Sequence, residues 1–198
     1  GIVIDNGFDV GIHIQSSNVV VEGCFLGTDP TGRIARGNTL GVSIDSPLAS
    51  SARIGGTLPG QRNVICANST GIFTQIGSGS NHVFQGNFIG LDATGTNALA
   101  NAVAIDLRTS DTLIGGTNVA ARNFIAGKGD GSNTGISVNG GTGNRIQGNF
   151  IGTDVTGTKG LGFDPGIFLA SGSVQIGGLT STPGTPPGNV ISANILGV

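Results

Sequence analysis

The chain has 198 residues, a net charge of −2 and 10% charged residues, and its lysines and arginines form no cluster. Nucleic-acid binding is therefore disfavoured, because it needs a basic surface and usually stacking aromatics. No apolar run is long enough to cross a bilayer, and 37% hydrophobic residues beside 38 glycines favour a folded, Gly-rich domain over a disordered polymer.

From the N-terminus onward, a short apolar strand that opens with Gly or Ala recurs six times. Its copies begin at Gly11, Gly41, Gly71, Ala102, Gly135 and Gly166. The intervals between them are 30, 30, 31, 33 and 31 residues. Ile or Val alternates with other residue types in most copies, which indicates β-strands rather than helices.

Each of these first strands is followed by a second and a third short strand. The second strands alternate between a type that ends in one Gly and a type that carries Ile-Gly-Gly. They occupy residues 19–23, 52–57, 82–86, 112–117, 144–148 and 174–179. The third strands, most of which open with Asn, occupy residues 24–27, 63–66, 87–90, 123–126, 149–152 and 189–192.

The pattern predicts one all-β domain over residues 1–198, with a partial coil in 1–10 and six coils of three strands in 11–198. GNFIGLDATGT at 86–96 and GNFIGTDVTGT at 148–158 match at nine of eleven positions, which indicates a two-coil super-repeat of 62 residues. In this string the Phe-Ile pair is predicted to be core and Asp-x-Thr-Gly to be a turn.

The recurring G-[IV]-x-[IV], I-G-G-T, N-[FV]-I and G-x-D-x-T-G elements resemble the right-handed parallel β-helix of the pectate-lyase-like superfamily and of exported bacterial surface repeat proteins. Such a fold places the third-strand asparagines in one column, and the resemblance implies that their amides hydrogen-bond along the axis as a ladder. Cys24 takes the first position of this column. The expected ladder consists of Asn63, Asn87, Asn123, Asn149 and Asn189.

The resemblance also implies a glycan groove along the exposed face of the first strands. If Ile and Val point inward, the alternate residues point outward in two rows. One predicted row is His13, Ser43, Phe73, Ala104, Ser137 and Phe168, and the other is Gln15, Asp45, Gln75, Asp106, Asn139 and Ala170. The predicted binding face comprises His13, Gln15, Asp45, Gln75, Asp106 and Asn139.

Asp45, Asp106 and Arg108 are the only candidates for catalysis. The two carboxylates are expected two coils apart, about 9.6 Å by strand spacing, at the edge of the range for inverting glycosidases. An outward Asp on a solvated sheet is ordinarily not catalytic, so the non-catalytic interpretation is preferred. The chain also lacks Trp and Tyr, the aromatic side chains on which sugar rings usually stack.

The remaining polar and sulfur-containing residues are interpreted structurally. Asp29, Asp92 and Asp154 are predicted to form Asx-turns, since a row spaced by two coils cannot share one Ca²⁺. Cys24 and Cys66 are predicted to be small buried thiols without a disulfide. His13 and His82 have no apparent Asp or Ser partner for a triad. No metal or cofactor is expected.

Three functions are consistent with this pattern. The preferred one is a non-catalytic extracellular scaffold or an interaction and adhesion module. The alternatives are a polysaccharide-active lyase or glycoside hydrolase, and an ice- or surface-binding solenoid. The expected partner is a polysaccharide or cell-surface component, and the expected location is extracellular or the cell surface.

The two ends of the repeat carry no recognisable cap. A solenoid end presents unpaired backbone groups and a cross-section of core. The sequence therefore predicts that the chain belongs to a longer array or that two copies stack end to end as a homodimer.

Overall fold

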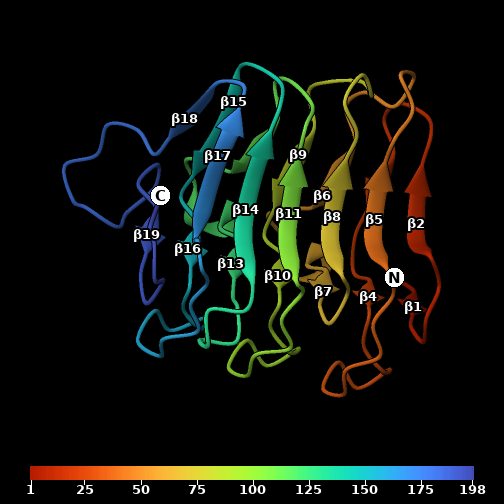
Figure 1. Ribbon diagram of the computed structural model, residues 1–198, viewed down its shortest axis with the longest axis horizontal. Coiled ribbons are helices and arrows are strands. Elements are labelled where there is room, and N and C mark those ends of the chain that lie inside the picture. Colours follow the sequence, from red (N-terminus) through yellow and green to blue (C-terminus); the bar gives the residue numbers. More distant parts are fainter.

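Three parallel sheets run the length of the molecule in the computed structural model, which describes residues 1–198 (Figure 1). The first-strand sheet contains β2 (Val10–Ile14), β5 (Leu40–Ile44), β8 (Thr70–Thr74), β11 (Val103–Leu107), β14 (Thr134–Asn139) and β17 (Ile167–Ser171). The second-strand sheet contains β3 (Val20–Val21), β6 (Arg53–Gly55), β9 (Val83–Gln85), β12 (Leu113–Gly115), β15 (Asn144–Gln147) and β18 (Val174–Ile176).

The third-strand sheet has seven members, because the partial first coil contributes β1. It contains β1 (Val3–Ile4), β4 (Phe25–Leu26), β7 (Val64–Ile65), β10 (Phe88–Ile89), β13 (Phe124–Ile125), β16 (Phe150–Ile151) and β19 (Val190–Ile191). Two 3₁₀ turns, η1 (Pro59–Gln61) and η2 (Val119–Ala121), lie between second and third strands. The predicted all-β solenoid of about six three-stranded coils is confirmed.

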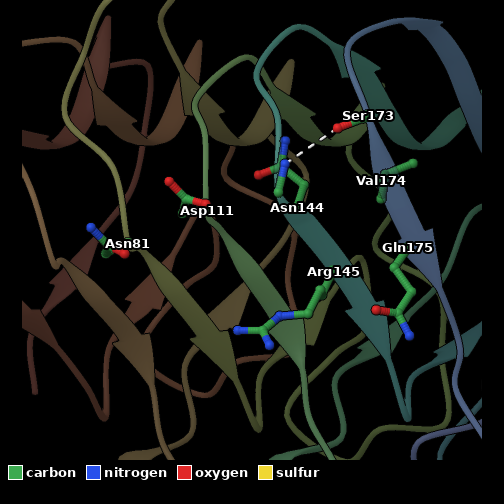
Figure 2. A pocket seen from close by; sticks show the side chains of 8 residues that line it. Asn81, Asp111, Asn144, Arg145, Ser173, Val174 and Gln175 are labelled. Carbon is green, nitrogen blue, oxygen red and sulfur yellow. Dashed lines mark hydrogen bonds between the residues drawn. The ribbon is translucent and has the colours of Figure 1, made fainter.

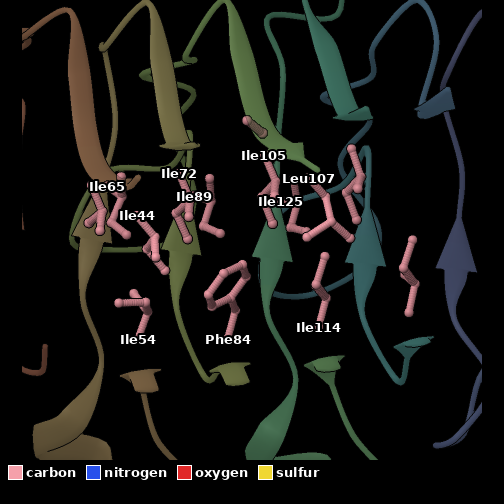
Figure 3. Close-up of a cluster of buried hydrophobic side chains, with 14 of the residues drawn as sticks. Ile44, Ile54, Ile65, Ile72, Phe84, Ile89, Ile105, Leu107, Ile114 and Ile125 are labelled. Carbon is pink, nitrogen blue, oxygen red and sulfur yellow. The ribbon is translucent and has the colours of Figure 1, made fainter. Parts of the chain in front are cut away.

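The interior of the coil is a continuous apolar core of 24 buried residues (Figure 3). In-register pairing places apolar side chains of successive coils next to one another. Ile72, Ile105 and Ile136 pair in the first-strand sheet, and Phe84 pairs with Ile114 in the second-strand sheet. Each fully buried side chain of this kind stabilises the fold by about 1.5–3 kcal/mol relative to exposure. The inward half of each period-two strand therefore builds one core along the axis.

The predicted asparagine ladder is present and fully bonded. The Nδ2 of Asn63 donates to Oδ1 of Asn87 at 3.0 Å, and the Nδ2 of Asn87 donates to Oδ1 of Asn123 at 3.1 Å. The series continues through Asn149 to Asn189 at 2.9 and 3.2 Å. Each Oδ1 also accepts from the backbone N–H one coil earlier, beginning with that of Cys24. The ladder satisfies buried corner groups that water cannot reach.

A second asparagine ladder, which the sequence analysis did not foresee, lies at the corner between third and first strands. The backbone N–H of Asn38 donates to Oδ1 of Asn68, and the N–H and Nδ2 of Asn68 both donate to Oδ1 of Asn101. Phe163, buried in the core, later interrupts the column, and its N–H donates to Asn194 Oδ1 at 2.9 Å. The link from the third strand is longer in alternate coils, which hides this column in the sequence.

Phe88 and Ile89 of the repeated string are both buried, as predicted, but they belong to two separate apolar clusters. Period two sends Ile89 inward and Phe88 outward. Phe88, Phe124 and Phe150 stack edge to face outside the third-strand sheet, with ring centroids 5.6 and 5.5 Å apart. Guanidinium groups cover this second cluster, Arg62 lying 4.1 Å from the Phe88 centroid.

The Asp-x-Thr-Gly turns form loops over the outer cluster, and the predicted role of their Asp residues in holding these turns is confirmed. The backbone donor lies two residues on at Asp154, as expected of an Asx-turn, but four and five residues on at Asp29 and Asp92. Asp92 accepts from Thr94 Oγ1 at 2.6 Å and from the side chain and backbone of Asn97. Burial by itself raises the pKa of Asp92, but these hydrogen bonds lower it by a larger amount. The resulting pKa lies below the usual value for Asp. Loops two coils apart also touch, since Ala93 N–H donates to Gly32 O at 2.8 Å.

We predict that Asn87→Ala destabilises the fold by about 3 kcal/mol, because it removes the buried hydrogen bonds that the Asn87 side chain makes with Asn63, Asn123 and Ile54. Asn189→Ala at the partly buried end of the ladder is the matched control and should cost about 1 kcal/mol. Urea unfolding of both variants measures the difference. Equal losses of stability in the two variants would show that an asparagine inside the ladder contributes no more than one at its end.

His82 is fully buried at the corner between first and second strands. Its Nδ1 accepts from the Ala52 N–H at 3.3 Å, whereas its Nε2 is buried without a hydrogen-bond partner. Burial lowers the pKa of His82, and the nearby Gly79 carbonyl opposes this in part. In the same column, Asn144 accepts from the Thr112 N–H at 2.9 Å and carries no titratable group.

We predict that the free energy of unfolding decreases as the pH falls below about 6.5, the unfolded-state pKa of His. Below this pH the unfolded chain binds a proton at His82, whereas the folded protein does not yet do so. His82→Asn should flatten the stability profile between neutral pH and the folded-state pKa. The lowered carboxylate pKa values act in a separate window below about pH 4. Chemical denaturation across pH tests this, and an unchanged profile in His82→Asn would contradict it.

Candidate functional site

The first strands present an outer face whose residues fall into two rows. Strand pairing defines the first row, which consists of His13, Ser43, Phe73, Asp106, Ser137 and Phe168. The second row lies two residues further along each strand and consists of Gln15, Asp45, Gln75, Arg108 and Asn139. Five of the six predicted binding-face residues therefore keep their rows.

The prediction that Asp106 lies in the same row as Asp45 is wrong. Asp106 pairs with Phe73 and Ser137 in the first row, and Ala104, predicted outward, is fully buried. The segment Ala-Val-Ala-Ile-Asp-Leu fits two registers two residues apart, because both send alternate apolar residues inward. The ladder contact between Asn68 and Asn101 selects the later register, which makes Ala104 the equivalent of Gly71.

The first polar cluster on this face joins coils one and two. His13 Nε2 lies 2.6 Å from Asp45 Oδ1, and the Gln15 amide lies 3.4 Å from the same nitrogen. Ser43 Oγ donates to the other Asp45 oxygen at 3.4 Å. The expectation that His13 lacks an acidic partner is thus wrong, because the partner comes diagonally from the next coil. Asp45 lies between Ser and His, whereas a catalytic triad needs His in the middle.

The second cluster joins coils three, four and five. Arg108 donates from Nε to Asp106 Oδ1 at 3.1 Å and from a terminal nitrogen to Oδ2 at 2.8 Å. Asn139 Nδ2 donates to Asp106 Oδ1 at 2.8 Å, and the Arg108 guanidinium lies 5.1 Å from the Phe73 ring centroid. The hydrogen bond to Asp106, and then its charge, raise the pKa of Arg108. Both oxygens of Asp106 are therefore occupied by donors.

A hollow of about 450 Å³ lies beside the second cluster. Four of its seven lining residues are polar, and Phe168, the one aromatic residue among them, is 48% exposed. The hollow therefore combines hydrogen-bonding side chains with one exposed aromatic ring. Its lining residues are Val103, Asp106, Thr134, Ser137, Asn139, Pro165 and Phe168.

The two cysteines provide no nucleophile. Both are free and buried, in agreement with the predicted absence of a disulfide. Burial, and then the charge of Asp92, raise the pKa of the Cys66 thiol to about 12. A thiol with this pKa holds almost no thiolate at neutral pH, and thiolate is the reactive form.

No protein-family model matches this chain, and no curated protein or solved structure matches it. The parallel β-solenoid is established by the strand pairing alone, and membership of the pectate-lyase-like superfamily stays a prediction from the repeat pattern. No helix in the structure has the length and apolar character required to traverse a bilayer. No group of three or more His, Cys, Asp and Glu side chains is arranged to hold a metal ion.

We predict that iodoacetamide at pH 8 labels neither Cys24 nor Cys66 in the folded protein and labels both in urea, because both thiols are buried and Cys66 resists ionisation. Mass spectrometry of the quenched samples gives the extent of labelling at each site. Rapid labelling of Cys66 without denaturant would overturn its assignment as a packing residue.

Proposed function

We propose that the chain is a non-catalytic interaction module, a β-solenoid whose first-strand face binds a polysaccharide of the extracellular space or cell surface. The observation that carries the proposal is the state of the two candidate carboxylates. Asp45 is held by His13 and Ser43, and Asp106 by Arg108 and Asn139. On this proposal the two carboxylates serve to link neighbouring coils by hydrogen bonds.

The relative position of Asp45 and Asp106 supports the same conclusion. They lie two coils apart and in different rows. An axial offset of about 9.6 Å with a lateral offset of about 6.6 Å places their strand positions about 12 Å apart. Carboxylates that flank a glycosidic bond are separated by about 5–9.5 Å. The pair therefore suits binding better than acid–base hydrolysis.

The repetition of the face suits an elongated ligand. Polar donors and acceptors recur at about 4.8 Å from coil to coil, and Phe73 and Phe168 add apolar surface to the first row. The hydrogen bonds of Asp45 and Asp106 and the two asparagine ladders hold the face in one conformation before a ligand binds. Preorganisation of this kind lowers the entropic cost of binding.

The test is affinity electrophoresis and calorimetry of the protein with a panel of neutral and acidic polysaccharides. Phe168→Ala should weaken binding of the retained polysaccharide about tenfold, since ring stacking and burial are lost. Leu179→Ala, which removes a fully exposed apolar side chain on a loop elsewhere, should change nothing. Retention of no polysaccharide would contradict the proposed ligand.

The same panel is assayed for reducing ends and unsaturated products, neither of which should accumulate. Product formation that disappears in Asp106→Asn would instead establish a polysaccharide-active enzyme. Thermal hysteresis in the absence of polysaccharide binding would favour the ice- or surface-binding alternative.

A further inference from the structure

The dipeptide Asn-Gly occurs twice in the chain, at residues 6–7 and 139–140. An asparagine before glycine is the most prone to lose its side-chain amide spontaneously, because glycine has no side chain to shield its backbone nitrogen. Every other asparagine is followed by a residue with a side chain. Figure 2 shows one of these, Asn144, directly before the long side chain of Arg145. The chain therefore contains two candidate sites for this reaction.

Amide loss at Asn-Gly is intramolecular and consumes only water. The glycine backbone nitrogen attacks Cγ of the asparagine, so that an N–Cγ bond forms and the Cγ–Nδ2 bond breaks. The glycine N–H proton passes to the departing Nδ2, which leaves as ammonia. Water then opens the cyclic imide at one of its two carbonyls and gives aspartate or isoaspartate. The asparagine side chain must first turn toward the following nitrogen, so any contact that holds it elsewhere slows the reaction.

The Asn139 side chain is held away from Gly140. Its Nδ2 donates to Asp106 Oδ1 at 2.8 Å and to Ser137 Oγ at 3.0 Å, so both amide protons are engaged. Ser137 lies two residues earlier on β14, so the amide points back along the strand. Arg108 fixes the Asp106 carboxylate by two hydrogen bonds. The Arg108 carbonyl oxygen also crowds Gly140, lying 3.1 Å from the position that a Cβ would take there.

The Asn6 side chain is free by comparison. It makes no hydrogen bond, and Asn6 and Gly7 are both exposed in the link between β1 and β2. Nothing lies within 4 Å of the position that a Cβ would take at Gly7. One bond opposes the reaction, since the Gly7 N–H donates to Gly37 O at 3.0 Å. This bond lies in an exposed link, where local opening of the backbone costs least.

We propose that Asn6 is a site of spontaneous deamidation in the folded protein, whereas Asp106 and Ser137 keep Asn139 unreactive. The charge-assisted bond to Asp106 is the stronger of the two restraints. Asp106 thus preserves the amide beside it, in addition to linking neighbouring coils. Conversion of Asn139 would replace a donor to Asp106 by a second carboxylate, and the like charges would repel. Neither the reaction at Asn6 nor the protection of Asn139 depends on polysaccharide binding.

The first test is mass spectrometry of the peptides that contain Asn6 and Asn139, after incubation of the folded protein in mildly alkaline buffer. Asn6 should convert at least about tenfold faster than Asn139, because only the Asn139 amide must break a charge-assisted hydrogen bond. In urea the two should convert at similar rates, since both side chains are then free. Equal rates in the folded protein, no conversion at Asn6, or a difference that persists in urea would overturn the proposal.

Asp106→Ala tests the protection directly. It should accelerate the conversion of Asn139 about tenfold, while Asn6 in the same sample keeps its rate and serves as an internal reference. Glu22→Ala removes another arginine-paired carboxylate, from the second-strand sheet, and as the matched control should change neither rate. Ser137→Ala leaves the ion pair of Asp106 intact and should give a smaller acceleration. An unchanged Asn139 rate in both variants on the first-strand face would contradict the proposed protection.

Discussion

The structure depends on the satisfaction of backbone and amide groups at the corners of the coil. A parallel strand pairs its own polar groups with the coils above and below, but a corner turns those groups away from the ladder of strand bonds. Asn is the side chain that can accept from one coil and donate to the next with a single amide. Columns headed by Asn63 and Asn38 do this at two of the three corners. Once two corners are fixed, the strands between them have no freedom of register.

The alternation of short and long coils adds a second layer of structure to the third-strand sheet. The links that follow β4, β10 and β16 contain the Asp-x-Thr-Gly loop, whereas the shorter links that follow β7 and β13 lack it. Because the loops belong to alternate coils, each reaches across a short coil to its neighbour, as Val155 N–H does to Gly95 O at 3.0 Å. The phenylalanines beneath these loops, together with Arg62 and Arg122, form a cluster outside the coil. The two-coil super-repeat is thus the period of this outer layer.

On the other two sheets the outward residues are free of such cover, and their pairing decides what each can do. Where a carboxylate meets a histidine from the next coil or an arginine from its own strand, as at His13–Asp45 and Asp106–Arg108, its oxygens are already occupied. Where the repeat has a glycine in place of a side chain, as at Gly143, the Asp111 carboxylate lies close to the position that a Cβ would take. The positions that depart from the repeat therefore differ chemically from those that follow it.

The sequence by itself determined the fold class, the approximate number of coils, the asparagine column after the second strands, and the structural role of Asp29, Asp92 and Asp154. These features repeat at nearly constant spacing and rest on local rules, namely strand alternation, side-chain hydrogen bonding and turn chemistry. The tertiary structure alone decided the register of β11, the second ladder through Asn38, Asn68 and Asn101, and the partner of His13. Each of these depends on which residues of different coils lie at the same height. An alternating apolar pattern is unchanged by a shift of two residues, so only contacts between coils can fix that height.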